Sequence, residues 1–289
     1  MNDFQNIAVI PNLTRNGAYE ASLNVIKKLQ SLDMNVLLDQ RMEQKYHGLA
    51  VTFKDEKSLY ADCDLVLTIG GDGTIIHASR YASLLGKPLL GINMGRLGFV
   101  AGIEPDELDM LSMLREGGYT VEKRMMLRVV HQSPNGKKEF YALNDAVISR
   151  GSLSRLIDID VFLAEDNGYI CNYRADGLIL STPTGSSAYS LAAGGPVVEP
   201  TMKCILMTPV CSHALFARPV LFSHHSEIAV KASCDDNTEV FLTIDGAGTV
   251  IVRKTDTVSV SCAKIVTELI SLKHKTFYRV LNDKFAERG

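Results

Sequence analysis

The sequence predicts two domains: an α/β N-terminal domain with a parallel sheet, and a mostly antiparallel β C-terminal domain. Two observations predict this division. Up to about residue 124, strand-like and helix-like patterns alternate, which favours a parallel sheet covered by helices. From there on, short β-type runs follow one another, and turn signals separate several of them. The 289 residues are enough for two domains, and we expect these to be residues 1–124 and 125–274.

The elements of the first domain follow from local patterns. Ala18–Leu32 and Thr74–Leu85 carry apolar residues at helical spacing. Glu104–Leu114 is an amphipathic pattern with Pro105 near its first turn, and Gly117-Gly118 follows as a stop signal. Ligands of such sheets bind beyond the carboxyl ends of the strands. The expected strands are Asn6–Ile10, Asn35–Leu38, Leu65–Ile69 and Pro88–Ile92.

The second domain is expected to be mostly antiparallel. Only Ser186–Ala193 has a helical pattern inside it, and the amphipathic tail Thr276–Glu287 is a candidate final helix. Asp245-Gly246, between two β-type runs, is the commonest hairpin signal and predicts a turn. The expected strands are Met126–His131, Glu139–Ile148, Leu156–Ala164, Tyr169–Tyr173, Leu178–Ser181, Cys204–Pro209, Glu227–Ala232, Glu239–Ile244, Thr249–Arg253 and Val258–Cys262.

Composition is that of an ordinary globular protein, with 46% hydrophobic and 22% charged residues. The net charge of −3 gives no basic footprint for nucleic acid, and no apolar run reaches the ~18 residues of a membrane span. The start, Met1–Asn6, lacks the features of a signal peptide. The six cysteines are scattered without a Cys-x-x-Cys pair, which predicts reduced thiols. We therefore expect a cytoplasmic protein without nucleic-acid or membrane partners.

The most informative segment is Gly70–Thr74, which reads Gly-Gly-Asp-Gly-Thr and directly follows the apolar run Leu65–Ile69. A short β-type run that ends this way is typical of a strand that delivers a loop to a phosphate site. Glycine tolerates positive φ and lets the backbone come close to a ligand. Successive loop N–H groups can then point at phosphate oxygens.

Asp72 is the lone carboxylate of this loop. A carboxylate repels phosphate, so attraction of that group cannot be its role. Its position predicts a proton acceptor, a group that orients a hydroxyl, or a metal ligand beside the phosphates. The structural alternative is a tight strand-to-helix turn in which Asp72 or Thr74 is the helix N-cap.

A second glycine-rich segment, Gly91–Phe99, also follows a predicted strand. Its glycines lie four and three residues apart, so it fails the Gly-x-Gly-x-x-Gly dinucleotide fingerprint, and the chain contains no Walker A loop. The segment could wall the same site as Gly70–Thr74, because both leave the same edge of the predicted sheet. The alternative is a plain strand-to-loop turn.

Two polar segments of the second domain suit a nucleotide. Asn144-Asp145 interrupts an apolar strand, and an amide beside a carboxylate can bond ribose hydroxyls or base edges; a bulge or strand end is the alternative. In Asp176–Ser190 a strand meets a small-residue loop and a helix start, where hydroxyls and free N–H groups suit phosphate or ribose. Tyr189 could stack on a base. The alternative is a simple helix capped by Ser186 or Ser187.

Taken together, these segments resemble the NAD kinase family of the bacterial type. They occur in that family's order, and Asp176–Pro196 is highly specific to it. The Gly-Gly-Asp-Gly-Thr motif alone is less specific, because diacylglycerol-type lipid kinases, sphingosine kinases and phosphofructokinases carry similar loops. The matching segments are Gly70–Thr74, Gly91–Phe99, Asn144-Asp145, Asp176–Tyr189, Gly194-Gly195-Pro196, Thr208–Cys211 with Arg218-Pro219, and Asp245-Gly246.

The resemblance implies an N-terminal α/β domain, a β-sandwich-like C-terminal domain and a site between them. It also implies that the tail, residues 275–289, packs back on the first domain. The implied reaction is transfer of the γ-phosphoryl group of ATP to the 2′-hydroxyl of the adenosine ribose of NAD, which gives NADP. Positioning and charge neutralisation by loop amides and Mg²⁺ would supply most of the catalysis.

The resemblance also implies residue roles. Asp72 matches the catalytic aspartate, which orients or deprotonates the ribose hydroxyl. Asp176 would lie near the nicotinamide amide, and Arg174 would reach a neighbouring subunit's site, which implies a homo-oligomer, either a dimer or a tetramer. No protein side chain is implied as a fixed metal ligand. The expected phosphate-, NAD- or ATP-binding residues are Gly70, Gly71, Gly73, Thr74, Phe99, Asn144, Asp145, Arg174, Asp176, Thr184, Ser187, Ala188, Tyr189, Asp245 and Gly246.

The chain departs from the family pattern at two positions. Asp145 stands where glutamate is usual and is one methylene shorter, and Ser187 stands where threonine is usual and keeps the hydroxyl. Two other functions are alternatives. A lipid or sphingoid-base kinase shares the glycine loop but leaves Asp176–Tyr189 unexplained. A dinucleotide sensor derived from the kinase would have no need of Asp72.

Overall fold

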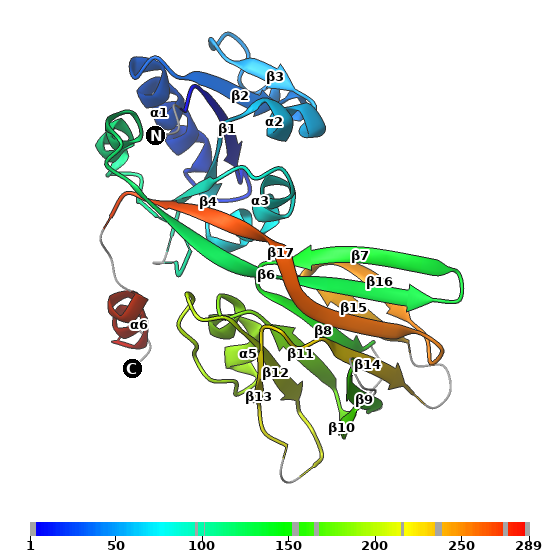
Figure 1. The fold of residues 1–289 in the computed structure, drawn as a ribbon. Coiled ribbons are helices and arrows are strands. Elements are labelled where there is room, and N and C mark those ends of the chain that lie inside the picture. Colours follow the sequence, from blue (N-terminus) through cyan, green and yellow to red (C-terminus); the bar gives the residue numbers. More distant parts are fainter. Residues whose placement is uncertain are drawn as a thin grey trace. The chain divides into compact units, whose positions relative to one another are not determined.

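The structure is a computed structural model of the chain, and it divides into two compact units (Figure 1). Unit 1 consists of Met1–Lys123 and Val266–Gly289, and unit 2 of Arg124–Ile265. Within the described part of the chain, no helix is both long and apolar enough to cross a membrane. The structure describes residues 4–95, 98–100, 102–151, 156–164, 168–214, 217–234, 239–273 and 277–286.

Unit 1 is built on a parallel sheet, which confirms the predicted architecture. Ile7 of β1 lies opposite Leu65 of β4, and β4 pairs with β5 on its other side. The end of β17 extends the sheet, with Leu269 opposite Leu89 of β5. In spatial order the strands are β3 (Thr52–Lys54), β2 (Asn35–Asp39), β1 (Asn6–Pro11), β4 (Leu65–Gly70), β5 (Leu89–Asn93) and β17 (Thr257–Ser271).

Among residues 4–95, three α-helices accompany this sheet, and the sequence patterns predict two of them. α1 forms where expected, because its apolar residues recur at helical spacing and are buried along one face. The short α2 is not predicted; Asp55 caps it by accepting a hydrogen bond from the Ser58 N–H at 3.1 Å. The helices are α1 (Ala18–Ser31), α2 (Glu56–Asp62) and α3 (Asp72–Leu84).

The two faces of the sheet bury separate cores, because side chains alternate along each strand. Ile7 and Val9 of β1 enter one core, whereas Ala8 enters the other. In the same way Leu67 and Val66 of β4 enter opposite cores. Each fully buried aliphatic side chain of this kind contributes roughly 1.5–3 kcal/mol, so β4 is firmly fixed, and with it the loop that follows.

The predicted helix Glu104–Leu114 is wrong in its first half. The carboxylate of Glu107 accepts a hydrogen bond from the Glu104 N–H at 2.8 Å, which makes the segment a turn, and it also pairs with Lys273. Gly117, at φ 74°, ends the short helix that follows, as the stop signal predicts. The helical pieces here are η2 (Leu108–Ser112), a 3₁₀ helix, and α4 (Met113–Glu116).

Unit 2 confirms the prediction of a mostly antiparallel β domain. Its strands form two layers around one hydrophobic core, which holds Ile159 of β9 from one layer and Leu178 of β11 from the other. One layer contains β6 (Thr120–Ser133), β7 (Gly136–Ala142), β9 (Ile157–Leu163), β10 (Gly168–Ala175), β14 (Ile228–Ser233) and β17. The other runs in the order β13 (Val220–Ser223), β12 (Cys204–Val210), β11 (Gly177–Ser181), β8 (Asp145–Arg150), β15 (Val240–Ile244) and β16 (Ala247–Val252).

Two predicted elements of unit 2 are split in the structure. The expected strand Glu139–Ile148 is two strands, β7 and β8, which belong to different layers. The expected helix Ser186–Ala193 is a 3₁₀ turn, η3 (Gly185–Ser187), and a four-residue helix, α5 (Tyr189–Ala192). Ala188 separates them because its φ of −102° and ψ of −124° are not helical.

The tail forms the helix α6 (Phe277–Ala286), within the predicted Thr276–Glu287. Thr276 and Glu287 themselves lie outside the described residues, as do Arg96 and Leu97 of the second glycine-rich segment. All six cysteines are free thiols.

Candidate functional site

In unit 1 the candidate chemistry lies where β4 ends and α3 begins. β4 is buried along its whole length, and Gly71 is the N-cap of α3. A Cβ on Gly70 would lie 2.2 Å from Thr74 Oγ1, so only glycine fits there, whereas a Cβ on Gly73 would meet nothing within 4 Å. None of the loop glycines has a positive φ. Gly70 is therefore needed because the backbone lies close to Thr74, and Gly73 leaves open space beside the loop. The expectation that these glycines provide positive φ is wrong.

Asp72 is the first residue of α3, and no side chain caps this helix. The alternative in which Asp72 or Thr74 is the N-cap is therefore wrong. The Thr74 N–H donates to the Gly71 carbonyl at 2.9 Å, which closes the first turn through the backbone. The carboxylate of Asp72 is thus not required to begin the helix.

The second glycine-rich segment meets the first at Asp72. The Asp72 carboxylate accepts hydrogen bonds from the Phe99 N–H at 2.8 Å and from the Val100 N–H at 3.2 Å. A Cβ on Gly98 would lie 2.1 Å from Asp72 Oδ1, so glycine is required for this approach. The Phe99 ring in turn lies against α6, with its centroid 4.2 Å from Lys284 Nζ. The two segments therefore form one structure within unit 1, which fixes the carboxylate.

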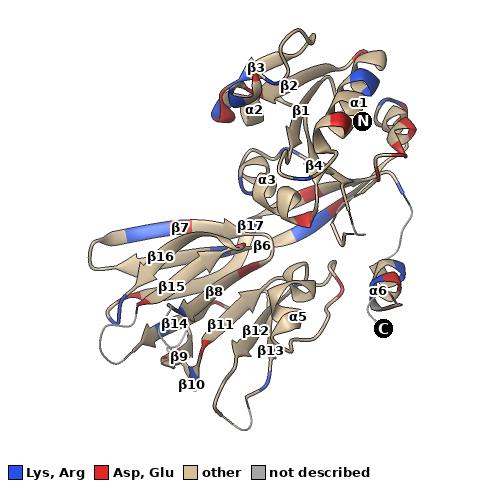
Figure 2. Cartoon of the chain, turned by 180° about the vertical axis from the view of Figure 1, so that it is seen from behind, with Lys and Arg blue, Asp and Glu red and all other residues tan. Residues whose placement is uncertain are grey.

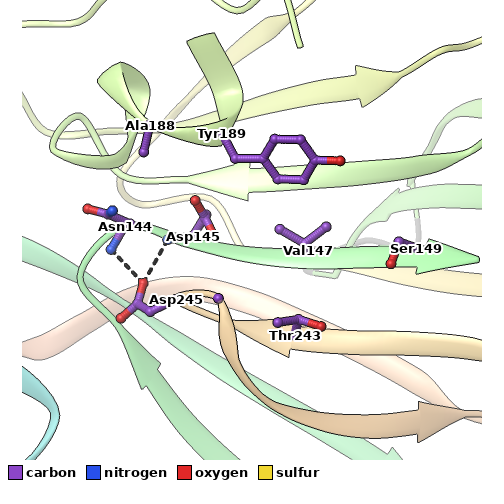
Figure 3. A pocket seen from close by; sticks show the side chains of 9 residues that line it. Asn144, Asp145, Val147, Ser149, Ala188, Tyr189, Thr243 and Asp245 are labelled. Atoms are coloured by element: carbon purple, nitrogen blue, oxygen red, sulfur yellow. Dashed lines mark hydrogen bonds between the residues drawn. The ribbon is translucent and has the colours of Figure 1, made fainter. Parts of the chain in front are cut away.

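In unit 2 a pocket of about 360 Å³ opens beside the start of β8. Figure 3 shows Ala188 and Tyr189 on one side of this strand and Thr243 and Asp245 on the other. The expected residues that the pocket brings together are Asn144, Asp145, Ala188, Tyr189, Asp245 and Gly246.

Asp245 organises this pocket through its carboxylate. The carboxylate accepts three backbone hydrogen bonds, from the N–H groups of Leu143, Asn144 and Asp145, at 2.8–3.0 Å. The Asp245 N–H donates to the Asp145 carbonyl at 2.9 Å. Asp245 and Gly246 have φ values of 48° and 67°, so the predicted hairpin turn is confirmed. The same carboxylate explains why the expected strand Glu139–Ile148 breaks at Asn144.

The strand-end alternative for Asn144-Asp145 is thus the structure that forms, yet both side chains are buried in the pocket wall. Burial, with a smaller contribution from the Asp245 charge, raises the pKa of Asp145 to about 7. Among the described residues, the buried Oδ1 of Asn144 has no hydrogen-bond partner. A buried acceptor without a partner is costly, so this oxygen is suited to a ligand donor.

Three residues of the pocket are missing from the sequence prediction: Val147, Ser149 and Thr243. Strand alternation could have found them, because residues two apart lie on one face. Asp145, Val147 and Ser149 share the pocket face of β8, whereas Ala146 and Ile148 enter the core.

Of the expected residues in unit 2, four do not line this pocket: Arg174, Asp176, Thr184 and Ser187. Asp176 accepts a hydrogen bond from Arg150 Nε at 2.7 Å, and Arg174 is exposed on β10. Thr184 is buried, and Ser187 Oγ donates to the Thr184 carbonyl at 3.2 Å. No serine caps η3 or α5, so the capped-helix alternative for this segment is wrong.

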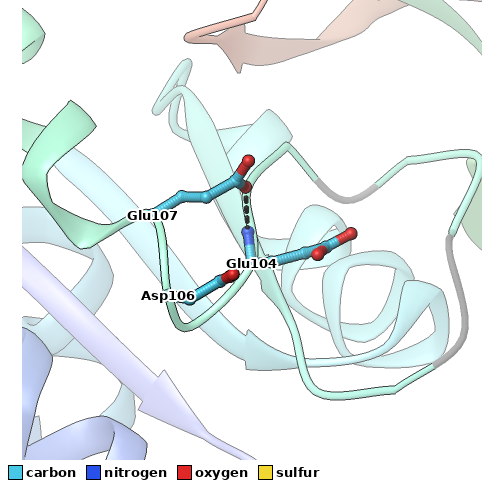
Figure 4. Close-up of side chains that lie close together, drawn as sticks. All are labelled: Glu104, Asp106 and Glu107. Carbon is cyan, nitrogen blue, oxygen red and sulfur yellow. Dashed lines mark hydrogen bonds between the residues drawn. The ribbon is translucent and has the colours of Figure 1, made fainter.

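Among the residues that the structure describes, one acidic group has a spacing that could hold a metal ion. Glu104, Asp106 and Glu107 place one carboxylate oxygen each within 4.8 Å of the others (Figure 4). Glu107 is already engaged by the Glu104 N–H and by Lys273, so this group is a structural turn.

Two known families match successive parts of the chain. The ATP-NAD kinase N-terminal domain matches residues 7–115, and the ATP-NAD kinase C-terminal domain matches residues 143–272. The NAD kinase of Moorella thermoacetica is 38% identical over 286 residues, which cover 99% of this chain and 90% of that protein. The chain belongs to the NAD kinase family. This membership makes it a kinase and decides against the lipid-kinase alternative.

Other relatives agree. The NAD kinase of a Thermoanaerobacter species is 36% identical over 284 residues, covering 98% of this chain and 99% of that one. The structure of yeast NADH kinase complexed with NADH has a TM-score of 0.90 and 25% identity, with coverage of 99% and 89%. An NAD kinase from Archaeoglobus fulgidus in complex with ATP has a TM-score of 0.77 at 24% identity, with coverage of 99% and 100%, and shares the fold.

Proposed function

We propose that this chain transfers the γ-phosphoryl group of ATP to the 2′-hydroxyl of the adenosine ribose of NAD, giving NADP. The observation that carries the proposal is the carboxylate of Asp72, held in a glycine loop at the end of a buried strand. A sensor of dinucleotides would need the binding residues but not this group.

Asp72 is the proposed catalytic residue. A ribose hydroxyl is a poor nucleophile, and a carboxylate within hydrogen-bond reach can orient it and accept its proton. The amides of Phe99 and Val100 fix the carboxylate, so little reorganisation is needed when the hydroxyl arrives. The proton moves from the hydroxyl oxygen to an Asp72 carboxylate oxygen as the new O–P bond forms. The bond between the γ-phosphorus and the β–γ bridging oxygen of ATP breaks in the same step, and ADP leaves with that electron pair.

The loop Gly70–Thr74 is the proposed phosphate site. Gly73 leaves open space where a side chain would stand, and a Cβ on Gly71 would meet only the Arg15 guanidinium, at 3.3 Å. Phosphate oxygens can thus approach the N–H groups at the start of α3. Mg²⁺ would arrive with ATP and neutralise phosphate charge.

The pocket beside β8 is the proposed NAD subsite. The free acceptor of Asn144 and the carboxyl of Asp145 suit ribose hydroxyls, which can donate to both. Tyr189 is 46% exposed and lines the pocket, so its ring is available for stacking on a base. Asp176, Thr184 and Ser187 are proposed contacts of the remaining part of NAD.

We also propose that the protein is a cytoplasmic homo-oligomer. Arg174 supports this, because it is exposed on β10, which lies at one end of its sheet. In a dimer or tetramer it could reach the NAD site of a neighbour. Light scattering would measure the oligomeric state. Kinetics of Arg174→Ala subunits, alone and mixed with native subunits, would test the role of Arg174. If Arg174 acts only within its own subunit, mixing should leave the rate per native subunit unchanged.

The first experiment is a coupled assay of NADP formation from NAD, ATP and Mg²⁺, with Asp72→Asn beside the native protein. We expect NADP with the native protein and none with the variant. NAD binding in calorimetry without any turnover would instead support a sensor, and absence of both would overturn the proposal.

A further inference from the structure

A second pocket of unit 2 lies between the β6–β7 hairpin and β16, and it shares no residue with the pocket beside β8. Its volume is about 430 Å³, compared with about 360 Å³ for the other. Both volumes are in the range of small-molecule sites. Its lining includes His131, Ser133, Lys138, Thr249, Ile251 and Arg253.

All acid or base side chains that line this pocket are basic: Lys137, Lys138, Arg253 and His131. The chain as a whole has a net charge of −3, so this cluster of basic side chains is opposite in sign to the net charge of the protein. Figure 2 shows the basic stretch of β7 in blue. Cations held near one another repel, and a bound anion relieves that repulsion.

Strand register places the polar groups on one face. His131 of β6 lies directly opposite Lys138 of β7, and Ser133 lies opposite Gly136, so these positions share a side of the hairpin. Thr249 and Ile251 are two residues apart on β16 and therefore share a face of that strand. The pocket thus combines cationic and hydroxyl donors with an apolar wall.

His131 is the buried member of this lining. Its exposed fraction is 5%, and its Nε2 lies 2.9 Å from Oδ2 of Asp256, which is 1% exposed. Asp256 also accepts the Arg253 N–H at 3.0 Å. This buried pair holds the imidazole in one orientation. Because Nε2 is paired with Asp256, Nδ1 is the ring nitrogen that can form a hydrogen bond with a ligand. The kinase mechanism uses neither residue.

We propose that this pocket binds a nucleotide-sized organic phosphate at a site separate from the kinase site. Lys138 and Arg253 would contact the phosphate oxygens by charge-assisted hydrogen bonds, with the Thr249 hydroxyl as a further donor. The Ser133 hydroxyl already donates to the Gly136 carbonyl at 3.1 Å and so shapes the pocket wall. Ile251 would contact the nucleoside part. Nucleoside diphosphates and phosphorylated dinucleotides share this chemistry, and the titration below distinguishes them.

The test follows the imidazole signal of His131 by NMR in ¹³C-histidine-labelled full-length protein, assigned with His131→Gln. ADP, NADP and inorganic triphosphate are titrated separately. The variant is Lys138→Gln with Arg253→Gln. The matched control is Lys264→Gln, an exposed lysine of unit 2 outside the pocket. We expect a saturable shift with ADP or NADP in the native protein and the control, and binding at least about tenfold weaker in the double variant.

The rate of NADP formation at saturating substrate should be the same in all these proteins, because the substituted lysines and arginine lie outside the kinase site. An unmoved His131 signal, or equal shifts in the native protein and the double variant, overturns the proposal. Inorganic triphosphate binding as tightly as both nucleotides would overturn the role assigned to Ile251 while supporting the phosphate site.

Discussion

The Phe99 backbone N–H donates a hydrogen bond to the Asp72 carboxylate over 2.8 Å. These residues are 27 positions apart and belong to different glycine-rich segments. Since a Cβ on Gly98 would overlap Asp72 Oδ1, the second segment needs its glycine for the sake of the first. The geometry of the proposed catalytic group thus depends on a loop that carries no catalytic side chain.

Asp72→Asn should abolish turnover while NAD affinity changes by no more than a few-fold. The amide cannot accept a proton, but it keeps one oxygen for the Phe99 or Val100 N–H. Rates of NADP formation and calorimetric NAD affinity check this. Asp106→Asn, at an exposed position of unit 1, is the control. A variant with a near-normal rate would rule out Asp72 as the proton acceptor.

Gly70→Ala and Gly73→Ala should separate folding from phosphate binding. The Gly70 substituent would lie 2.2 Å from Thr74 Oγ1, so we expect a loss of roughly 1–3 kcal/mol in the free energy of unfolding. The Gly73 substituent meets nothing within 4 Å, so stability should stay the same or rise by up to about 1 kcal/mol. Gly73→Ala should nevertheless raise the KM for ATP. Urea unfolding and kinetics decide, and an unchanged KM would contradict the phosphate role.

Because the pKa of Asp145 is raised to about 7, the free energy of unfolding depends on pH through this group. The folded state holds this proton where the unfolded chain has lost it, so the free energy of unfolding should fall as pH rises from about 4 to about 7. Asp145→Asn should remove that slope and be more stable than the native protein by roughly 1–3 kcal/mol at about pH 8.

NAD binding should show the opposite trend, because the charged carboxylate is the better acceptor for ribose hydroxyls. We expect the KM for NAD to fall between about pH 6 and about pH 8 in the native protein and to stay flat in Asp145→Asn. Chemical denaturation and kinetics over this range test both statements. Parallel pH profiles in the two proteins would show that another group titrates.

Asp245→Gly should show whether Asp245 is needed for the backbone conformation of the turn or for the hydrogen bonds that its carboxylate accepts. Glycine suits the φ of 48° at this position, so a residue needed only for the turn would tolerate the change. We expect instead a loss of about 1–3 kcal/mol and a higher KM for NAD, because three backbone donors lose their acceptor. Asp245→Asn keeps one acceptor and should be intermediate. An Asp245→Gly protein with native stability and KM would assign this residue to the turn alone.

Tyr189→Ala should weaken NAD binding more than it slows the chemical step, because the ring lines the pocket and makes no contact assigned to the reacting atoms. Tyr189→Phe keeps the ring and should retain most of the affinity. The comparison of KM for NAD with kcat measures this. NAD saturation unchanged in Tyr189→Ala would exclude stacking.

Most of the fold could be predicted because its strands carry strong local patterns. Leu65–Ile69 is continuously apolar, as a strand buried on both faces must be, and the structure buries it completely. Asp245-Gly246 predicts its turn for an equally local reason, since both residues tolerate positive φ.

The elements that failed are those decided by distant partners. Glu139–Ile148 has one strand-like pattern, yet it forms two strands. The reason is that the carboxylate of Asp245, about a hundred positions further on, accepts hydrogen bonds from the backbone N–H groups of Leu143 and Asn144. Glu104–Leu114 has helical spacing, but Glu107 bonds back to the Glu104 N–H and to Lys273. A local sequence pattern carries no information about contacts with residues far away along the chain. The Gly98 requirement at Asp72 is of the same kind.

Unit 1 is built from two segments that are separated in sequence by the whole of unit 2, and this separation affects how the protein folds during synthesis. Leu269 extends the sheet beside Leu89, and Ile270 and Leu272 are buried in the core of unit 1. All of Arg124–Ile265 is translated before these residues leave the ribosome. Until then the nascent chain exposes the part of the β5 edge at Leu89, to which another strand can add, whereas Ile103 already bridges Ile92 further along β5. The part of the molecule that is synthesised first is therefore the last to be completed.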